Sequence, residues 1–231
     1  HPPGRGPNLF YFFPRVFVPL LMAQEKHAFQ WFPIDPWKRK GTYLFFRDYQ
    51  DPFFMLTAQI EVSRARKDSN TPFFLKYVHQ ALKVMDELPA WRLRFHDQEN
   101  LCLYDHVDAG CTVAREDGSF YFADFGYQSD LEQFVALGQA VLASQKEVPG
   151  LQPNDYRNDI AFFSVLPWVH FTAFKNPHRE AYSDHWPRIV SGKIKETQGR
   201  HYMPLSLEVH HSLMDGRDLG DFFEALEERL A

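Results

Sequence analysis

Apolar residues recur at helical spacing in three parts of the chain. This spacing predicts helices over residues 72–88, 130–148 and 219–230. Thr71 stands where an N-cap is expected for the first helix, with Pro72 in its first turn, and Pro89 follows its end. Each predicted helix has one apolar side, which must pack against another layer of the structure.

Shorter runs of β-branched and aromatic residues lie between these helices. Residues 91–95 and 101–104 flank a polar segment, which is typical of a β-hairpin. Residues 162–174 form a further β-type run, but Pro167 must bend it or place part of it at a sheet edge. Residues 204–211 form the last strand. We therefore expect one α/β domain, an α+β two-layer sandwich with a mixed sheet and helices packed on one face.

Several classes of protein are excluded by composition and motif. No Gly-rich phosphate loop is present, so binding of a nicotinamide or a nucleoside triphosphate has no support. The formal net charge is −5 and no basic footprint appears, which argues against a nucleic-acid partner. Cys102 and Cys111 form neither a disulfide framework nor a zinc-binding spacing, so we expect a reducing, cytoplasmic location.

The first residues differ in character from the rest of the chain. Residues 8–22 are apolar and aromatic, but Pro14 and Pro19 interrupt them, leaving runs far shorter than the roughly 20 residues of a membrane helix. A signal peptide has a positively charged start, an uninterrupted apolar core and a cleavage site of small residues, and this order is not seen here. We therefore expect no membrane partner. Residues 1–21 are predicted to be a non-native or disordered N-terminal extension, and residues 22–231 a single domain.

The last strand ends in two adjacent histidines, followed by Asp215 and Gly216. Strand alternation places His211 on the apolar face with Leu205, Leu207 and Val209, and His210 on the opposite face. A histidine in partly desolvated surroundings keeps a neutral nitrogen near neutral pH, so His211 is a candidate general base with Asp215 as a structural carboxylate nearby. Gly216 is expected to permit the turn that follows.

Two other interpretations of this segment remain open. The histidines can be a satisfied pair at a strand-to-helix turn, in which Asp215 and Gly216 only form the turn. They can also belong to a zinc or iron site, but adjacent strand histidines point to opposite faces and cannot readily chelate one ion. No metal is therefore expected.

The segment from Pro204 to Gly216 closely resembles the His-His-x-x-x-Asp-Gly signature of chloramphenicol acetyltransferases. Further segments resemble this family in the same order along the chain, and together they cover about Ile34 to Leu230. These segments are Trp37–Lys40, Phe54–Thr57, Glu87–Arg94, Ser164–Phe171 and Pro187–Lys193.

The resemblance implies direct acyl transfer from acyl-coenzyme A, with acetyl-coenzyme A as co-substrate, to a hydroxyl of a small molecule. It implies that His211 is the general base and that Ser164 donates to the oxyanion of the tetrahedral intermediate. It also implies that Asp215 pairs with Arg39 and holds the strand end. The alternatives are a strand serine bonded to its own backbone at Ser164 and a solvated charge at Arg39.

Coenzyme A contacts and the assembly also follow from the resemblance. Trp168 and Lys193 match positions that contact coenzyme A in the family, as an apolar wall and as a charge for a phosphate. The resemblance further implies a homotrimer with active sites at subunit interfaces. In such a trimer His211 comes from one chain and much of the acceptor pocket from its neighbour.

The positions that line the acceptor pocket in the family depart from its pattern. Phe54 keeps the family's aromatic residue, but Phe46, Pro52, Phe162 and Val190 stand where the family or some of its members have tyrosine, cysteine, asparagine and threonine. Each change removes a polar group from the implied pocket, and each lost hydrogen bond costs on the order of 1 kcal/mol. We therefore expect chloramphenicol itself to be a poor acceptor.

Two other functions remain open for this chain. Dihydrolipoyl acyltransferase cores share the implied fold and a His…Asp-Gly end, but they are normally joined to further domains by flexible linkers, and no such linker appears here. A non-catalytic binding or assembly protein on the same scaffold is the other alternative. It predicts loss of the general base, of the arginine–aspartate pair or of the oxyanion donor, yet candidates for all three are present in His211, Arg39 with Asp215, and Ser164.

Overall fold

The computed structural model describes residues 26–97, 99–146, 157–178 and 184–231. The predicted extension over residues 1–21 lies outside these ranges. Among the described helices, none is both long enough and apolar enough to cross a bilayer.

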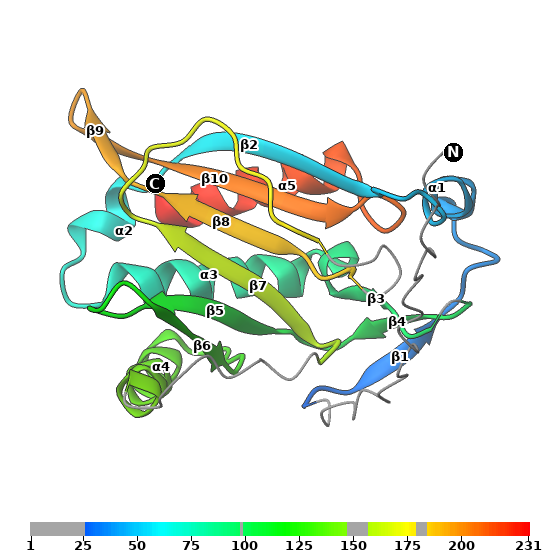
Figure 1. The fold of residues 1–231 in the computed structure, drawn as a ribbon, viewed down its shortest axis with the longest axis horizontal. Coiled ribbons are helices and arrows are strands. Elements are labelled where there is room, and N and C mark those ends of the chain that lie inside the picture. Colours follow the sequence, from blue (N-terminus) through cyan, green and yellow to red (C-terminus); the bar gives the residue numbers. More distant parts are fainter. Residues whose placement is uncertain (1–25, 98, 147–156, 179–183) are drawn as a thin grey trace, which may run out of the picture.

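One large mixed sheet forms the centre of the structure (Figure 1). The strands β5, β7 and β8 pair in parallel, and the other neighbours pair antiparallel. The strands in spatial order are β2 Phe53–Glu61, β10 Arg200–His210, β8 Arg188–Gly192, β7 Ile160–Leu166, β5 Asp108–Ala114 and β6 Phe120–Phe125, with β9 Lys195–Thr197 paired to β10.

A small second sheet lies at one end of the large one. Its strand order is β1-β4-β3, with β1 Phe29–Phe32, β4 Leu101–Tyr104 and β3 Leu93–Phe95. Leu93 pairs with Leu103 and Phe95 with Leu101, so the predicted hairpin is present. Its first strand is shorter than predicted, because residues 89–92 form a 3-10 helix, η1, that begins at Pro89.

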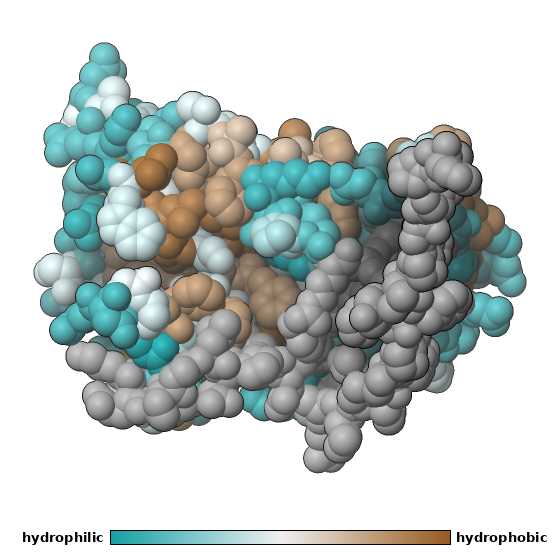
Figure 2. Space-filling view, viewed as in Figure 1, coloured by the Kyte–Doolittle hydropathy of each residue, from teal (hydrophilic) through white to brown (hydrophobic). Residues whose placement is uncertain are grey.

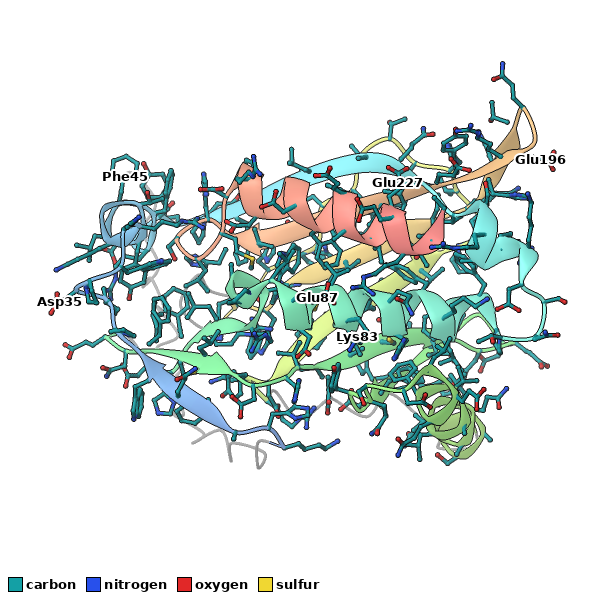
Figure 3. All side chains as sticks on the ribbon, turned by 180° about the vertical axis from the view of Figure 1, so that it is seen from behind. Asp35, Phe45, Lys83, Glu87, Glu196 and Glu227 are labelled. Carbon is teal, nitrogen blue, oxygen red and sulfur yellow. The ribbon has the colours of Figure 1, made fainter. Side chains whose placement is uncertain are left out.

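The helices α3 Phe73–Glu87 and α5 Gly216–Leu230 lie side by side on one face of the large sheet (Figures 1 and 3). The other helices lie at the margins: α1 Lys40–Phe46, α2 Ser63–Lys67 and α4 Leu131–Lys146. Helices on one face of a mixed sheet make the predicted two-layer α+β sandwich, and this prediction is confirmed.

The core lies between the sheet and these helices. Leu205, Leu207 and Val209 on β10 project into it and are fully buried, as their alternation predicts. The ring of Trp91 packs 4.2 Å from that of Phe222 on α5, centroid to centroid. Each large apolar side chain removed from water here stabilises the fold by about 1.5–3 kcal/mol.

The opposite face of β10 is also buried, which the alternation does not predict. Ser206 and Glu208 are only 2% and 1% exposed. The segment that follows β7 crosses in front of β8 and β10 on this side (Figure 1). The hydroxyl of Ser206 donates to the carbonyl of Phe174, and Asn176 donates to Glu208 through its backbone N–H and its Nδ2. We call this crossing segment, residues 167–178, the strap.

Several predicted boundaries are wrong, each for a local reason. Pro72, and not Thr71, is the N-cap of α3, and no side chain caps this end. Of the β-type run predicted over residues 162–174, only the part up to Leu166 is strand, as β7. It ends directly before Pro167, which has no N–H for a sheet ladder. The strand β10 begins at Arg200, earlier than predicted, and ends one residue before His211.

The helix α5 begins at Gly216, three residues earlier than predicted. Its start is set by Asp215, whose Oδ1 accepts from the backbone N–H of Arg217, while the Asp215 N–H donates to Asp218 Oδ2. This reciprocal arrangement is a capping box. Gly216 does not have a positive φ, and a Cβ there would meet only Phe54 at 3.7 Å. Asp215, rather than the glycine, therefore makes the turn.

Candidate active site

His211 lies directly after β10, between two aromatic rings. Its ring stacks on Phe46 with centroids 4.0 Å apart and on Phe54 with centroids 4.8 Å apart. Its backbone N–H donates to the carbonyl of Pro52 at 2.7 Å, which ties it to the start of β2. The imidazole is therefore held at a fixed angle, half-buried in apolar surroundings.

The hydrogen bond of His211 fixes its tautomer. Its Nδ1 lies 3.1 Å from the carbonyl oxygen of Met214. A carbonyl only accepts, so Nδ1 carries the proton of this bond. In the neutral ring, Nε2 then has a free lone pair. This is the arrangement that a general base needs.

His210 lies on the other side of the strand. It is fully buried, with its ring against Phe53 and Phe95, and its Nδ1 lies 2.7 Å from the hydroxyl of Ser212. The two histidines thus face different surroundings, in agreement with the strand alternation. Within the described ranges, no group of three or more His, Cys, Asp or Glu side chains could hold a metal ion.

Arg39, just before α1, joins two carboxylates at the start of α5. Its Nη2 lies 3.2 Å from Asp215 Oδ2, and its Nη1 donates to Asp218 Oδ2 at 2.6 Å. The face of Trp37 lies 5.8 Å from the guanidinium carbon. Asp218 was missed from the sequence, although Asp-x-x-Asp before an apolar run is a capping-box pattern. The arginine therefore links α1 to the turn that carries His211.

Ser164 lies on β7, on the sheet face away from α3 and α5. Its hydroxyl is 3.5 Å from that of Thr112 on β5. It lines a cavity of about 580 Å³ together with Phe162 and Val190. Figure 2 shows apolar side chains gathered on this side of the molecule, over the middle of the sheet.

The same cavity has polar walls that sequence reasoning missed. Two of these residues lie in the strap and one in the segment before β8, where no periodic pattern predicts the direction of a side chain, and the fourth is the first residue of β8. They are Asn176, His178, Asp184 and Arg188. The part of the pocket that contains Ser164 therefore carries polar and charged side chains as well as Phe162 and Val190.

One chain does not bring His211 and Ser164 together. Ser164 pairs with Val190, and Val190 pairs with Ser206 on β10. His211 lies five residues beyond Ser206, so the two Cα atoms are roughly 20 Å apart, from two strand spacings and five residues of rise. The site residues thus form two groups. His211, Arg39, Asp215, Phe46 and Phe54 make one group, and Ser164, Phe162 and Val190 make the other.

Trp168 and Lys193 lie near each other beyond the ends of β7 and β8. The backbone N–H of Lys193 donates to the carbonyl of Val169 at 2.8 Å, and Trp168 is 69% exposed. A Cβ on Gly192 would lie 2.8 Å from that same carbonyl, so the glycine permits this close approach. Lys193 and Arg66 both line a neighbouring cavity of about 300 Å³.

Comparison with known proteins decides the family. The family described as chloramphenicol acetyltransferase matches residues 27–227. The chain belongs to the chloramphenicol acetyltransferase family. It is accordingly an acyl-coenzyme A-dependent acyltransferase, and the resemblance predicted from the sequence is confirmed.

Individual relatives agree with this family. Chloramphenicol acetyltransferase 3 of Escherichia coli is 29% identical over 210 residues, covering 85% of this chain and 94% of the relative. The chloramphenicol acetyltransferase of Staphylococcus aureus is 26% identical over 202 residues, covering 84% of this chain and 92% of the relative.

Solved structures share the fold. A chloramphenicol acetyltransferase structure superposes with a TM-score of 0.80 at 25% identity, covering 88% of this chain and all of the other. The dihydrolipoamide acetyltransferase of Azotobacter vinelandii superposes with a TM-score of 0.61 at 20% identity, covering 83% of this chain and 86% of the other. The second likeness concerns the fold alone.

Proposed function

We propose that this protein transfers an acyl group, acetyl in the first instance, from acyl-coenzyme A to a hydroxyl of a small molecule, with His211 as general base. The observation that carries the proposal is the hydrogen bond from His211 Nδ1 to the Met214 carbonyl, which leaves the Nε2 lone pair available. Phe46 and Phe54 stack on the imidazole and hold its ring plane in place.

The reaction proceeds by direct attack. His211 Nε2 takes the proton of the acceptor hydroxyl while the hydroxyl oxygen forms a bond to the thioester carbonyl carbon. The carbonyl oxygen becomes an oxyanion, to which the Ser164 hydroxyl donates. When the C–S bond breaks, the imidazolium returns its proton to the thiolate sulfur. The products are the ester and free coenzyme A, and no metal or covalent acyl-enzyme takes part.

Arg39 positions the general base. It holds the start of α5 through Asp215 and Asp218, and α5 follows directly on the turn that contains Met214. We assign Arg39 and Asp215 to positioning the turn, and no proton passes through them. A fixed imidazole angle matters because a small misplacement of the reacting groups is expensive in rate.

The assembly that joins the two groups of site residues is a homotrimer with sites between copies. Its support is the separation of roughly 20 Å between His211 and Ser164 within one chain, which is too long for one bound acceptor hydroxyl to span. Exposed apolar side chains on or near the sheet face away from α3 and α5, among them Met55, Trp168 and Val169, suit an interface between subunits. Each site then takes His211 from one copy and Ser164 from the next.

Coenzyme A is assigned to the end of the sheet at Trp168 and Lys193. The exposed indole offers an apolar wall for the pantetheine chain, and Lys193 offers a point charge for a phosphate. The acceptor is assigned to the rings of Phe46 and Phe54 beside His211 and to the cavity of Phe162 and Val190. The relatives named for chloramphenicol make hydroxyl-bearing small molecules the acceptor class to test.

The experiment measures coenzyme A release from acetyl-coenzyme A with a panel of small alcohols. We expect His211→Ala to lose at least about a hundredfold in rate. His201→Ala, at the far end of β10, is the matched control and keeps the full rate. Full activity in His211→Ala, or no His211-dependent release with any alcohol, would contradict the proposed function.

Mixing two inactive variants tests the shared site. Co-expression of His211→Ala and Ser164→Ala chains in equal amounts should restore about a quarter of the wild-type rate, since random assembly leaves a quarter of the interfacial sites intact. The two variants purified separately and assayed without exchange are the control. Absence of restored activity in proven mixed oligomers would show that each site belongs to one chain.

A further inference from the structure

The cavity that contains Ser164 has a charged wall, and the proposed chemistry makes no use of it. His178, Asp184 and Arg188 line this cavity, yet each is largely buried, with 12%, 5% and 14% of the side chain exposed. Burying charged groups is costly unless they are paired. A charged wall in an acceptor pocket therefore calls for an explanation beyond acyl transfer itself.

The wall is an ordered chain of ionisable groups. Glu208 on β10 accepts from His178 Nε2 at 2.9 Å, and from the backbone and side chain of Asn176. His178 Nδ1 lies 3.4 Å from Asp184 Oδ2. The other oxygen of Asp184 accepts from Arg188 Nη2 at 2.5 Å. The chain thus runs from carboxylate to imidazole, to carboxylate, to guanidinium.

Arg188 ends this chain with hydrogen-bond donors to spare. A guanidinium has five N–H donors. One N–H of Nη2 is taken by Asp184, and Nη1 makes a long 3.5 Å contact with the carbonyl of Trp186. The rings of Phe53 and Phe162 lie 5.8 and 6.0 Å from the guanidinium carbon and limit its movement. The remaining donors are available to a molecule in the cavity.

Arg188 and Ser164 face the same space. Phe162 pairs with Arg188, and Ser164 pairs with Val190, in the parallel ladder of β7 and β8. The two residues therefore share a sheet face, offset by two residues on adjacent strands, with Cα atoms roughly 8 Å apart. One small acceptor can reach both side chains at once.

The geometry points to an acceptor that carries a carboxylate, bound by Arg188, at the end away from its reacting hydroxyl. This inference rests on the proposed acyl transfer and names its substrate class. A carboxylate matches the planar fork of a guanidinium and takes up the donors that Asp184 leaves unused.

An acceptor with a positive charge is disfavoured by the same contacts. Glu208 is 1% exposed and already accepts three hydrogen bonds. Asp184 is turned toward Arg188 and His178. Neither carboxylate has an open side toward the cavity that compares with the free edge of Arg188. The cavity therefore offers a ligand donors rather than acceptors.

The test compares three acceptors of one shape: 4-(hydroxymethyl)benzoate, its methyl ester, and 4-(hydroxymethyl)benzylamine. Coenzyme A release gives kcat/KM for each, and titration calorimetry gives the Kd of each without turnover. We expect the acid to exceed the ester and the amine at least tenfold in both measurements. Equal values for acid and ester, or preference for the amine, overturn the inference.

Two variants assign the effect to Arg188. Arg188→Gln should remove the advantage of the acid over the ester, and Arg188→Lys should keep part of it. Arg200→Gln, whose arginine is exposed and pairs with Glu61 outside the cavity, is the matched control. If Arg188→Gln does not fold, Arg188→Lys decides, and an undiminished acid preference in it overturns the inference.

The two proposals fail separately in this design. His211-dependent turnover of the ester without preference for the acid refutes the carboxylate and leaves acyl transfer standing. Arg188-dependent binding of the acid without turnover of any alcohol supports the carboxylate site and refutes acyl transfer. If both proposals are wrong, the two measurements show it separately. Calorimetry then shows no preference for binding the acid, and the coenzyme A assay shows no turnover of any alcohol.

Discussion

Arg39 Nη1 lies 2.6 Å from Asp218 Oδ2, closer than the 3.2 Å that separates its Nη2 from Asp215 Oδ2. The arginine therefore bonds more tightly to the third residue of α5 than to its N-cap. Arg39 is 24% exposed at its side chain, Asp218 21% and Asp215 40%. The partner that resemblance to the family implied is the more exposed and more distant of the two.

We expect Arg39→Ala to lower the free energy of unfolding by about 1–3 kcal/mol, between the values for exposed and for fully buried pairs. Loss of the ion pair with Arg39 should destabilise the fold more in Asp218→Asn than in Asp215→Asn. All three variants should lower the acyl-transfer rate. Urea unfolding and coenzyme A release measure the two effects. The control is Arg217→Ala, whose side chain is 86% exposed. An unchanged free energy of unfolding in Arg39→Ala and Asp218→Asn would show that the ion pairs of Arg39 do not stabilise the fold.

The sequence predicted those features that depend on short-range pattern. The parity of residues 204–211 predicted that His210 and His211 lie on opposite sides, and helical spacing predicted α3, α4 and α5. These predictions hold because a strand's alternation and a helix's period are set by local backbone geometry. The boundaries of these elements follow less directly from the pattern, since Pro89 and Asp215 act through turns whose hydrogen bonds involve only one or two residues.

Features that depend on distant contacts were not predictable. The sequence of β10 does not predict that the strap covers Ser206 and Glu208, since the strap lies about 30 residues earlier in the chain. The charged wall of the Ser164 cavity has the same origin. Likewise, the separation of Ser164 from His211 follows from strand order, which pairs β7 with β8 rather than with β10.

The acid stability of the fold should depend on Asp108. Burial alone would raise the pKa of this carboxyl, but hydrogen bonds from His27, Arg157 and the backbone N–H of Tyr127 outweigh it and lower the pKa to about 2. Since the folded pKa lies below the unfolded value of 3.8, the stabilisation is present above about pH 4. It is lost as the pH falls toward 2.

We expect Asp108→Asn to cost about 2 kcal/mol at pH 7, from a pKa difference of nearly two units. The difference from wild type should shrink below pH 4 and vanish near pH 2. Urea unfolding at several pH values measures it. Asp117→Asn, on an exposed turn between β5 and β6, is the control. A difference that stays constant from pH 7 to pH 2 would assign the loss to packing instead of charge.

Gly192→Ala should disturb the end of the sheet assigned to coenzyme A. Its Cβ would lie 2.7 Å from Pro204 and 2.8 Å from the Val169 carbonyl, closer than real contacts allow. The backbone must shift, and the hydrogen bond from Lys193 to Val169 weakens. We expect a loss of about 1–3 kcal/mol in stability and a higher KM for acetyl-coenzyme A. Gly220→Ala, with open space around its Cβ position, is the control, and an unchanged KM in Gly192→Ala would contradict the assignment.

Chloramphenicol should be a poor acceptor for this protein. It is a neutral molecule, so it leaves the donors of Arg188 without the partner that the proposed carboxylate supplies. Phe162 and Val190 also line this cavity and offer it no side-chain hydrogen bond. Each buried polar group that is left without a hydrogen bond when chloramphenicol is bound costs about 1–3 kcal/mol. Two such groups lower kcat/KM for chloramphenicol by roughly a hundredfold or more.

The opposing contribution comes from apolar stacking, since Phe46 and Phe54 lie beside His211 and could hold an aromatic acceptor. Stacking of one ring adds about 0.5–1.5 kcal/mol beyond its buried area, which is less than two lost hydrogen bonds. Coenzyme A release with chloramphenicol and with 4-(hydroxymethyl)benzoate measures the balance, beside growth of a sensitive host on the antibiotic. We expect the benzoate to be the better acceptor and the host to stay sensitive. Efficient acetylation of chloramphenicol at micromolar KM, with full resistance, would show that the stacking decides and that the polar wall does not.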